Sequence, residues 1–88
     1  MTTTKNNFIK HFIETTNKKE LQKNLIFSRR HLKDNINLID IIGNKVYYYV
    51  KTSGNNLYIY YGELWGENKV VKVQKISILK FFDFYFKN

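Results

Sequence analysis

The sequence contains no cysteine and no proline. Without cysteine it has no disulfide, no thiolate metal site and no thiol nucleophile, and a reducing cytoplasmic compartment is the simplest fit. No apolar run reaches the length needed to span a membrane. The first residues, MTTTKNNFIKHF, lack the uninterrupted apolar core of a secretory signal. We therefore expect a cytoplasmic protein without membrane association.

Recognisable catalytic motifs are also lacking. His11 and His31 stand alone, without the spacing of paired metal ligands. No serine lies in a nucleophile elbow, and no glycine-rich phosphate loop is present. We therefore predict a protein that is not an enzyme and has no cofactor. A metal-free nuclease that uses a histidine is the enzymatic alternative.

What the sequence does contain is enough for one domain with one core. Its 88 residues are 43% hydrophobic and 17% aromatic, and each aromatic side chain buries a large area. The formal net charge of +8 favours a polyanionic partner. The lack of alanine and the many Lys, Asn, Ile, Phe and Tyr residues are typical of AT-rich coding, as in a phage, virus, plasmid or low-GC bacterium. Such coding also supplies lysines.

The domain, residues 1–88, is predicted to be α+β, with a helical part at 1–34 and an antiparallel sheet at 36–86. Apolar residues at helical spacing predict a first helix around Phe8 to Ile13. Asn17 and Glu20 have the spacing of a capping pair and predict a second helix. One side of this second helix would carry Leu21, Leu25, Ser28 and Leu32. We expect both helices on one face of a curved meander of four to five strands.

Three turns containing glycine punctuate the meander, at Gly43-Asn44, at Gly54-Asn55 and at 66–68. Gly-Asn favours a two-residue hairpin turn, and two such turns sort the side chains consistently between two faces. One face collects Ile39, Ile41, Val46, Tyr48, Val50, Leu57, Ile59 and Tyr61. The other collects Lys45, Tyr47, Tyr49, Lys51, Tyr58 and Tyr60. A slip of one residue would invert this sorting.

The third hairpin and the C-terminal segment leave alternatives open. We favour a bulge at Gly62 with Glu67-Asn68 as the turn, over a three-residue turn without a bulge. In residues 77–86, β-branched and aromatic residues favour a fifth strand. In the alternative helix, Leu79, Phe82 and Phe86 would share a stripe.

The main candidate site is the face rich in tyrosine. It comprises Tyr47, Tyr49, Tyr58 and Tyr60, with Lys45, Lys51 and Lys72 around them. Aromatic rings on a sheet can stack with nucleobases while lysines contact phosphates. The ordinary interpretation is cross-strand pairing that stabilises the hairpin. If the helices cover the aliphatic face, the tyrosine face stays open to a partner.

Two weaker candidates lie outside this face. Arg29 and Arg30 belong to a basic cluster at the end of the second helix and could contact phosphates. Cations at a helix C-terminus also interact favourably with its dipole, and we favour that interpretation. Trp65 could anchor a partner, but we expect it to cover an edge of the core.

The first hypothesis is therefore a basic, non-enzymatic module that binds single-stranded nucleic acid through the Tyr/Lys face. The alternative is an inhibitor or adaptor of the phage or mobile-element type that binds an acidic surface of a host protein, such as a nucleic-acid enzyme or a defence complex. A homodimer formed through an open sheet face or edge strand is a third expectation.

Overall fold

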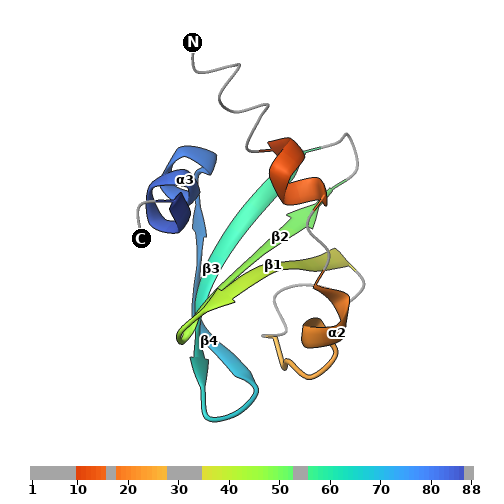
Figure 1. The fold of residues 1–88 in the computed structure, drawn as a ribbon, viewed down its shortest axis with the longest axis vertical. Helices are drawn as coiled ribbons and strands as arrows, with labels where there is room; N and C mark the ends of the chain where they lie inside the picture. Colours follow the sequence, from red (N-terminus) through yellow and green to blue (C-terminus); the bar gives the residue numbers. More distant parts are fainter. Residues whose placement is uncertain (1–9, 16–17, 28–34, 53–55, 87–88) are drawn as a thin grey trace.

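The computed structural model describes residues 10–15, 18–27, 35–52 and 56–86. Within these residues, four strands form one antiparallel sheet in chain order: β1 (Ile36–Ile42), β2 (Lys45–Lys51), β3 (Leu57–Trp65) and β4 (Lys69–Ile76). Residues 10–15 are helical, α2 (Lys19–Gln22) follows them, and α3 (Ile78–Phe86) follows the sheet (Figure 1). The predicted α+β class and antiparallel meander are confirmed.

The first hairpin has the predicted turn, and the three residue pairs nearest to it form as predicted. Gly43 has a φ of 62°, which glycine adopts without a Cβ clash. A bulge after Leu38 then shifts the register, so that Leu38 instead of Ile39 lies opposite Tyr48. Ile39 consequently packs in the cluster that contains Tyr47, where it is fully buried.

The predicted register of the second hairpin is wrong by one residue. A two-residue turn at Gly54-Asn55 required Thr52 opposite Leu57, but Lys51 occupies that place. The connection is longer, and the Thr52 N–H donates a hydrogen bond to the Asn56 carbonyl oxygen at 2.9 Å. Residues 53–55 lie outside the described part of the chain. Because side chains alternate along a strand, this shift moves every β3 side chain to the opposite face.

The third hairpin combines the two predicted alternatives. Its turn has three residues, so that Trp65 lies opposite Lys69. A bulge also forms beside Gly62, but the extra residue belongs to β4, where Lys72 has a φ of 55°. Gly62 permits this close packing, because a Cβ atom there would lie 2.8 Å from Val70 Cγ1.

The C-terminal segment is a helix, so the predicted fifth strand is wrong. Ser77 caps the N-terminus of the helix. Its Oγ accepts a hydrogen bond from the Lys80 N–H at 3.0 Å, and its carbonyl oxygen accepts one from the Phe81 N–H at 2.9 Å. Phe81 is fully buried. Leu79 and Phe86, the ends of the stripe considered for a helix, are instead exposed.

Helix α2 is shorter than the predicted second helix. It ends at Gln22, and Lys18 precedes it without a side-chain capping hydrogen bond. Leu21, predicted on the core side, is 49% exposed, whereas Leu25 beyond the helix end is buried. The predicted cap at Asn17, the predicted continuation past residue 27 and the first nine residues lie outside the described residues.

The segment around α2 covers parts of both sheet edges. The Gln22 side chain donates a hydrogen bond from Nε2 to the Ile36 carbonyl at 2.8 Å and accepts one at Oε1 from the Leu38 N–H at 2.9 Å. Ile26 forms an isolated parallel bridge with Lys69 at the start of β4. Both contacts reduce the unpaired backbone that could pair with a second chain.

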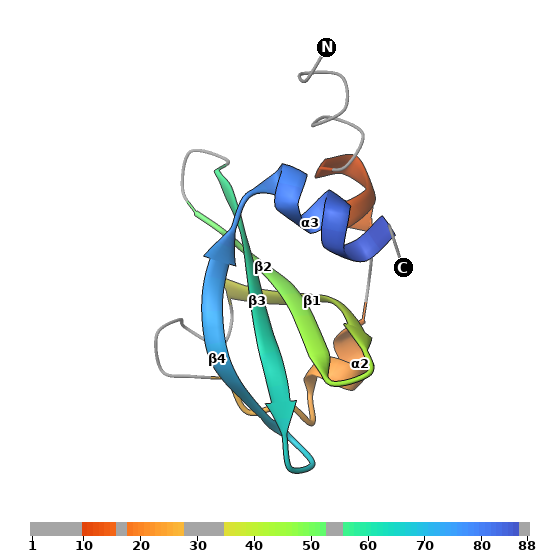
Figure 2. The same ribbon diagram turned by 90° about the vertical axis from the view of Figure 1, so that its left-hand side faces the viewer.

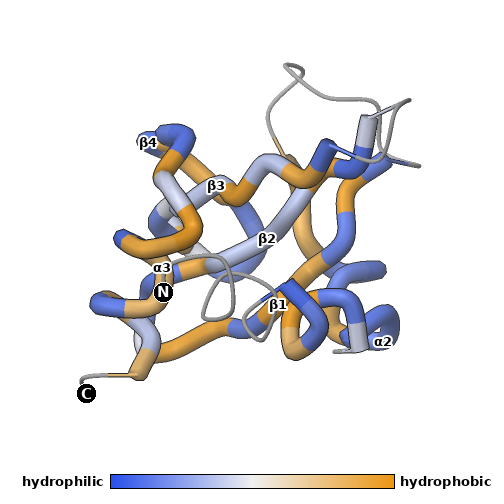
Figure 3. Tube along the Cα trace, turned by 90° about the horizontal axis from the view of Figure 1, so that it is seen from above, coloured by the Kyte–Doolittle hydropathy of each residue, from blue (hydrophilic) through white to orange (hydrophobic). Residues whose placement is uncertain are grey.

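Helices cover the two faces of the sheet at opposite ends (Figures 1 and 2). The α3 cluster consists of Ile13, Ile39, Tyr47, Tyr49, Ile59, Ile76 and Phe81. The Leu25 cluster consists of Leu25, Ile36, Leu38, Val46, Tyr48, Val50 and Val70. Hydrophobic stretches accordingly recur along the strands and in α3 (Figure 3). Ile13 of the helical residues 10–15 belongs to the α3 cluster, whereas Leu25, which follows α2, belongs to the Leu25 cluster. The predicted placement of two N-terminal helices on one face is therefore only partly confirmed.

Candidate functional site

The tyrosines predicted to share an open face are separated, and two of them are buried. Tyr47 is 1% exposed and Tyr49 is 8% exposed. Helix α3 covers Tyr47, whose ring centroid lies 5.6 Å from that of Phe81 and 5.9 Å from that of Tyr85. Burial raises the pKa of both phenols, Tyr47 and Tyr49. Neither ring is accessible to a base in this structure.

The other two tyrosines lie on the opposite sheet face because of the shifted second hairpin. Tyr60 stacks on Tyr48, with ring centroids 5.4 Å apart and an interplanar angle of 14°. Tyr58 is partly exposed, and Lys75 Nζ lies 4.9 Å from its ring centroid. The prediction of one open tyrosine face is therefore wrong: Tyr47 and Tyr49 are buried, and the register of β3 places Tyr58 and Tyr60 on the opposite face of the sheet.

The predicted basic residues do not all lie together. Lys51 forms an ion pair with Glu14, with 2.7 Å between Nζ and Oε2. Their hydrogen bond raises the pKa of Lys51 and lowers the pKa of Glu14. Lys51 thus ties β2 to the helical residues 10–15. Arg29 and Arg30 lie outside the described residues.

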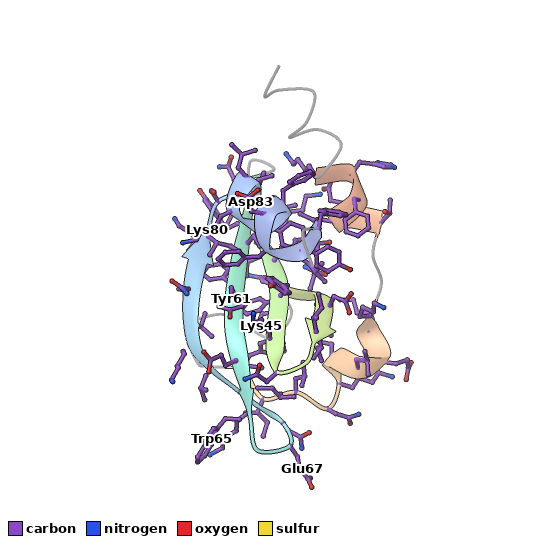
Figure 4. All side chains as sticks on the ribbon, turned by 60° about the vertical axis from the view of Figure 1, so that its left-hand side comes forward. Lys45, Tyr61, Trp65, Glu67, Lys80 and Asp83 are labelled. Carbon is purple, nitrogen blue, oxygen red and sulfur yellow. The ribbon has the colours of Figure 1, made fainter. Side chains whose placement is uncertain are left out.

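A different aromatic and basic surface lies on the part of the sheet that α3 leaves uncovered. Trp65 ends β3 and is 67% exposed. Alternation and the strand registers place it on the same face as Lys45, Tyr61 and Lys69. In Figure 4, Trp65 lies near the hairpin tip, and Tyr61 and Lys45 lie between it and α3. Lys45, Tyr61, Trp65, Lys69 and Lys72 are termed the tryptophan face.

The lysines of the tryptophan face are all exposed. Lys72 Nζ lies 3.9 Å from Glu63 Oε1, and this solvent-exposed ion pair contributes little to stability. Lys45 comes from β2 and Lys69 from β4, on either side of the β3 aromatic residues. Cations beside an exposed indole ring can contact phosphates while the ring stacks on a base.

A cavity of about 300 Å³ lies where this face meets α3. Its lining residues are Lys45, Tyr47, Tyr61, Gln74, Asp83 and Phe84. The Tyr61 ring centroid lies 5.4 Å from that of Tyr47 and 5.7 Å from that of Phe84, so aromatic rings form the inner wall. The volume is at the lower end of that of small-molecule sites, which begin at about 300 Å³.

A part-buried hydrogen bond helps to hold the helix that forms one side of this cavity. The Tyr85 hydroxyl of α3 donates to Asp40 Oδ2 of β1 at 2.6 Å. Asp40 Oδ1 also accepts a hydrogen bond from the Ile41 N–H at 2.8 Å. Burial and the hydrogen bond to Asp40 raise the pKa of Tyr85 to about 12. Tyr85 is therefore neutral at physiological pH and can donate this hydrogen bond.

The described part of the chain has neither a candidate metal centre nor a candidate membrane span. No group of three or more His, Cys, Asp or Glu residues there could hold a metal ion. No helix among those residues combines the length and the apolar content needed to cross a bilayer. His11, in the helical residues 10–15, is exposed.

No protein-family model, curated protein or solved structure matches this chain. The functional interpretation therefore depends on the chain's own residues.

The sequence analysis named Trp65 as a candidate anchor for a partner but favoured a position covering an edge of the core. The alternative three-residue turn was the signal that would have placed Trp65 on the same face as Tyr61. Gln74 and Asp83 were missed as cavity residues, and no local pattern could have found them. They line one cavity only because α3 packs against β2, β3 and β4.

Proposed function

We propose that this protein is a small, basic, non-enzymatic module that binds single-stranded nucleic acid through the tryptophan face. The observation that supports this most is the 67% exposure of Trp65 beside the exposed Lys45 and Lys69. Stacking on a base would remove the indole ring from water while the lysines contact phosphates. The net charge of +8 adds a longer-range attraction to the polyanion.

The spacing of the aromatic side chains on β3 suits a single-stranded nucleic acid that lies along this β-strand. Tyr61 and Trp65 point to the same face, four residues apart, which corresponds to about 13 Å along a strand. A short single strand could therefore meet Trp65 at one end and the cavity beside Tyr61 at the other. The proposed contact surface replaces the tyrosine face expected from the sequence.

Trp65 is the chain's single tryptophan, so the tryptophan fluorescence of the protein reports directly on the proposed contact. Titration with an oligothymidylate of about ten nucleotides, within the usual range of site sizes, is expected to quench its fluorescence at low salt. With about three phosphate contacts, the log–log slope of affinity against salt should be near −2. If low salt gives neither quenching nor a rise in the anisotropy of a labelled oligonucleotide, the proposal fails.

Matched variants separate stacking from charge. Trp65→Ala is expected to weaken oligonucleotide binding about tenfold, because stacking contributes about 1–3 kcal/mol per base. Leu79→Ala, which removes an exposed apolar side chain from α3, is its control and should bind as the wild type does. Lys69→Gln should lower the steepness of the salt dependence by about 0.7. Lys23→Gln, at an exposed position after α2, should leave it unchanged.

The exposed indole ring also favours a second candidate function, because tryptophan is enriched at protein interface hot spots. In that case the chain would be an inhibitor or adaptor that binds an acidic surface of a host nucleic-acid enzyme or defence complex. A pull-down from lysate with and without nuclease separates the two functions. Partners that survive nuclease treatment but are lost with Trp65→Ala favour the protein partner, and loss of all partners to nuclease favours nucleic acid.

A further inference from the structure

We propose that the cavity between α3 and the sheet receives one base of the bound strand and selects guanine. This inference rests on the proposed nucleic-acid function and adds a base preference to it. Trp65 would stack on a neighbouring base without regard to its identity, since every base has a π-face. The cavity would therefore be the part of the surface that distinguishes one base from another.

The aromatic lining and the volume of the cavity suit a single planar ring system. Tyr47, 1% exposed, lies at its floor, and Tyr61 and Phe84 form an aromatic wall. The volume of about 300 Å³ is small for a ligand site but sufficient for one unstacked base. Unstacked bases bind against aromatic rings and are recognised through their polar edges.

Three exposed polar side chains from three elements complete the lining: Lys45 from β2, Gln74 from β4 and Asp83 from α3 (Figure 4 labels Lys45 and Asp83). The Asp83 carboxylate only accepts hydrogen bonds, the Lys45 ammonium only donates, and the Gln74 amide does both. A base that fits this set must offer donors to the carboxylate and an acceptor to the lysine or the amide.

Guanine meets these requirements best. Its Watson–Crick edge presents two adjacent donors, N1–H and the 2-amino group, next to the O6 acceptor, so both oxygens of one carboxylate can be used. Thymine and uracil offer one donor between two acceptors, and adenine and cytosine offer an amino donor beside an acceptor. For those bases, one carboxylate oxygen would face an acceptor or no polar group.

The charge of Asp83 strengthens the inference. On a surface that binds phosphates, a carboxylate weakens binding to any strand by repulsion. Removing this charge should therefore slightly raise the affinity for a strand without guanine. Removing a base-reading carboxylate should at the same time lower the affinity for guanine. A loss of folding would instead lower both affinities, so the opposite signs identify base recognition.

The test compares three oligonucleotides of about ten nucleotides that differ at one central base, thymine, guanine or hypoxanthine. Hypoxanthine is guanine without the 2-amino group. The full-length protein is expected to bind the guanine strand about tenfold more tightly than the thymine strand, as for one bidentate contact to a base. The hypoxanthine strand should bind with an affinity close to that of the thymine strand. A parallel series in oligouridylate tests the same preference in RNA.

Asp83→Asn should abolish the preference for guanine without weakening binding to the thymine strand. Glu67→Gln is the control, because it removes an exposed carboxylate of the hairpin turn that does not line the cavity. It should leave the guanine preference intact.

A guanine preference in either series that Asp83→Asn removes would support the inference. Equal affinities for the three strands in both series, accompanied by Trp65 quenching, would overturn the guanine site and leave the proposed function standing. A preference that survives in Asp83→Asn would also overturn it. Absence of binding to every strand would overturn the inference and the proposed function together.

Discussion

Two regions of one sheet face differ mainly in what covers them. Tyr47 lies under α3 and is 1% exposed, whereas Trp65, on the same face beyond the helix, is 67% exposed. Both regions consist of aromatic residues on neighbouring strands, so strand propensity does not distinguish them. The docking of α3 turns one region into core and leaves the other as a surface. Exposure of an aromatic strand residue here is decided by a helix that comes later in the chain.

The largest effect on stability is expected when the buried side chain of α3 at the centre of the covered region is removed. Phe81→Ala should lower the free energy of unfolding by about 3–5 kcal/mol, because it leaves a cavity beneath α3 at a fully buried site. Urea denaturation followed by far-UV circular dichroism measures the loss. Leu79→Ala on the same helix, at a site that is 42% exposed, should cost much less. Similar losses for both variants would contradict the described docking of α3.

The second test breaks the hydrogen bond between α3 and β1. Tyr85→Phe should cost about 1.5–3 kcal/mol at neutral pH, because the part-buried Asp40 carboxylate loses a donor. The folded-state pKa of Tyr85, about 12, lies above its unfolded value of about 10.

The raised pKa also predicts how stability changes with pH. Stability from the protonated Tyr85 is complete below about pH 10 and is lost as the pH rises towards 12. Urea denaturation across this range should therefore show a shallower decline for Tyr85→Phe than for the wild type. A residual decline is expected in the variant, because the pKa values of Tyr47 and Tyr49 are also raised. Identical pH profiles for the two proteins would contradict the assignment.

A third test acts on the start of α3 alone. Ser77→Ala should destabilise the protein by about 1 kcal/mol, because the Lys80 N–H loses its side-chain acceptor. Ser77→Asp retains an acceptor and should remain close to the wild type in thermal denaturation. An equal loss in both variants would show that the hydroxyl has another role.

The smallest effect is expected in the uncovered region. Trp65→Ala should change the free energy of unfolding by no more than about 0.5 kcal/mol, since most of the side chain is already in water. The same variant is expected to weaken oligonucleotide binding strongly. A stability loss close to that of Phe81→Ala would mean that Trp65 belongs to the core.

Much of the fold could be read from local patterns, and the errors have specific causes. The turn at Gly43 and its neighbouring pairs were predictable, because Gly-Asn between apolar runs specifies a hairpin. The register of β3 was not, because Leu57, Ile59 and Tyr61 on one side are matched by Tyr58 and Tyr60 on the other. Either set is apolar enough to pack, so alternation alone does not choose between them.

The C-terminal helix shows a second kind of error. Ser77 followed by apolar residues at positions 78, 81, 82 and 85 is a capped helical pattern. The aromatic and β-branched composition of the same segment outweighed that pattern in the sequence reasoning. Predicting a strand there removed the helix that covers Tyr47, and the tyrosine face was therefore predicted to be open. The wrong prediction of an open tyrosine face thus followed from two errors, the strand predicted in place of α3 and the register of β3.

By itself the sequence determined the α+β class, the antiparallel meander, the first turn and the excess of basic charge, since each depends on residues close in the chain or on composition alone. Only the tertiary structure decided which aromatic rings are buried and which face water. Both faces of the strands can pack, and the choice was made by contacts between distant segments, above all Phe81 against Tyr47 and Tyr85 with Asp40.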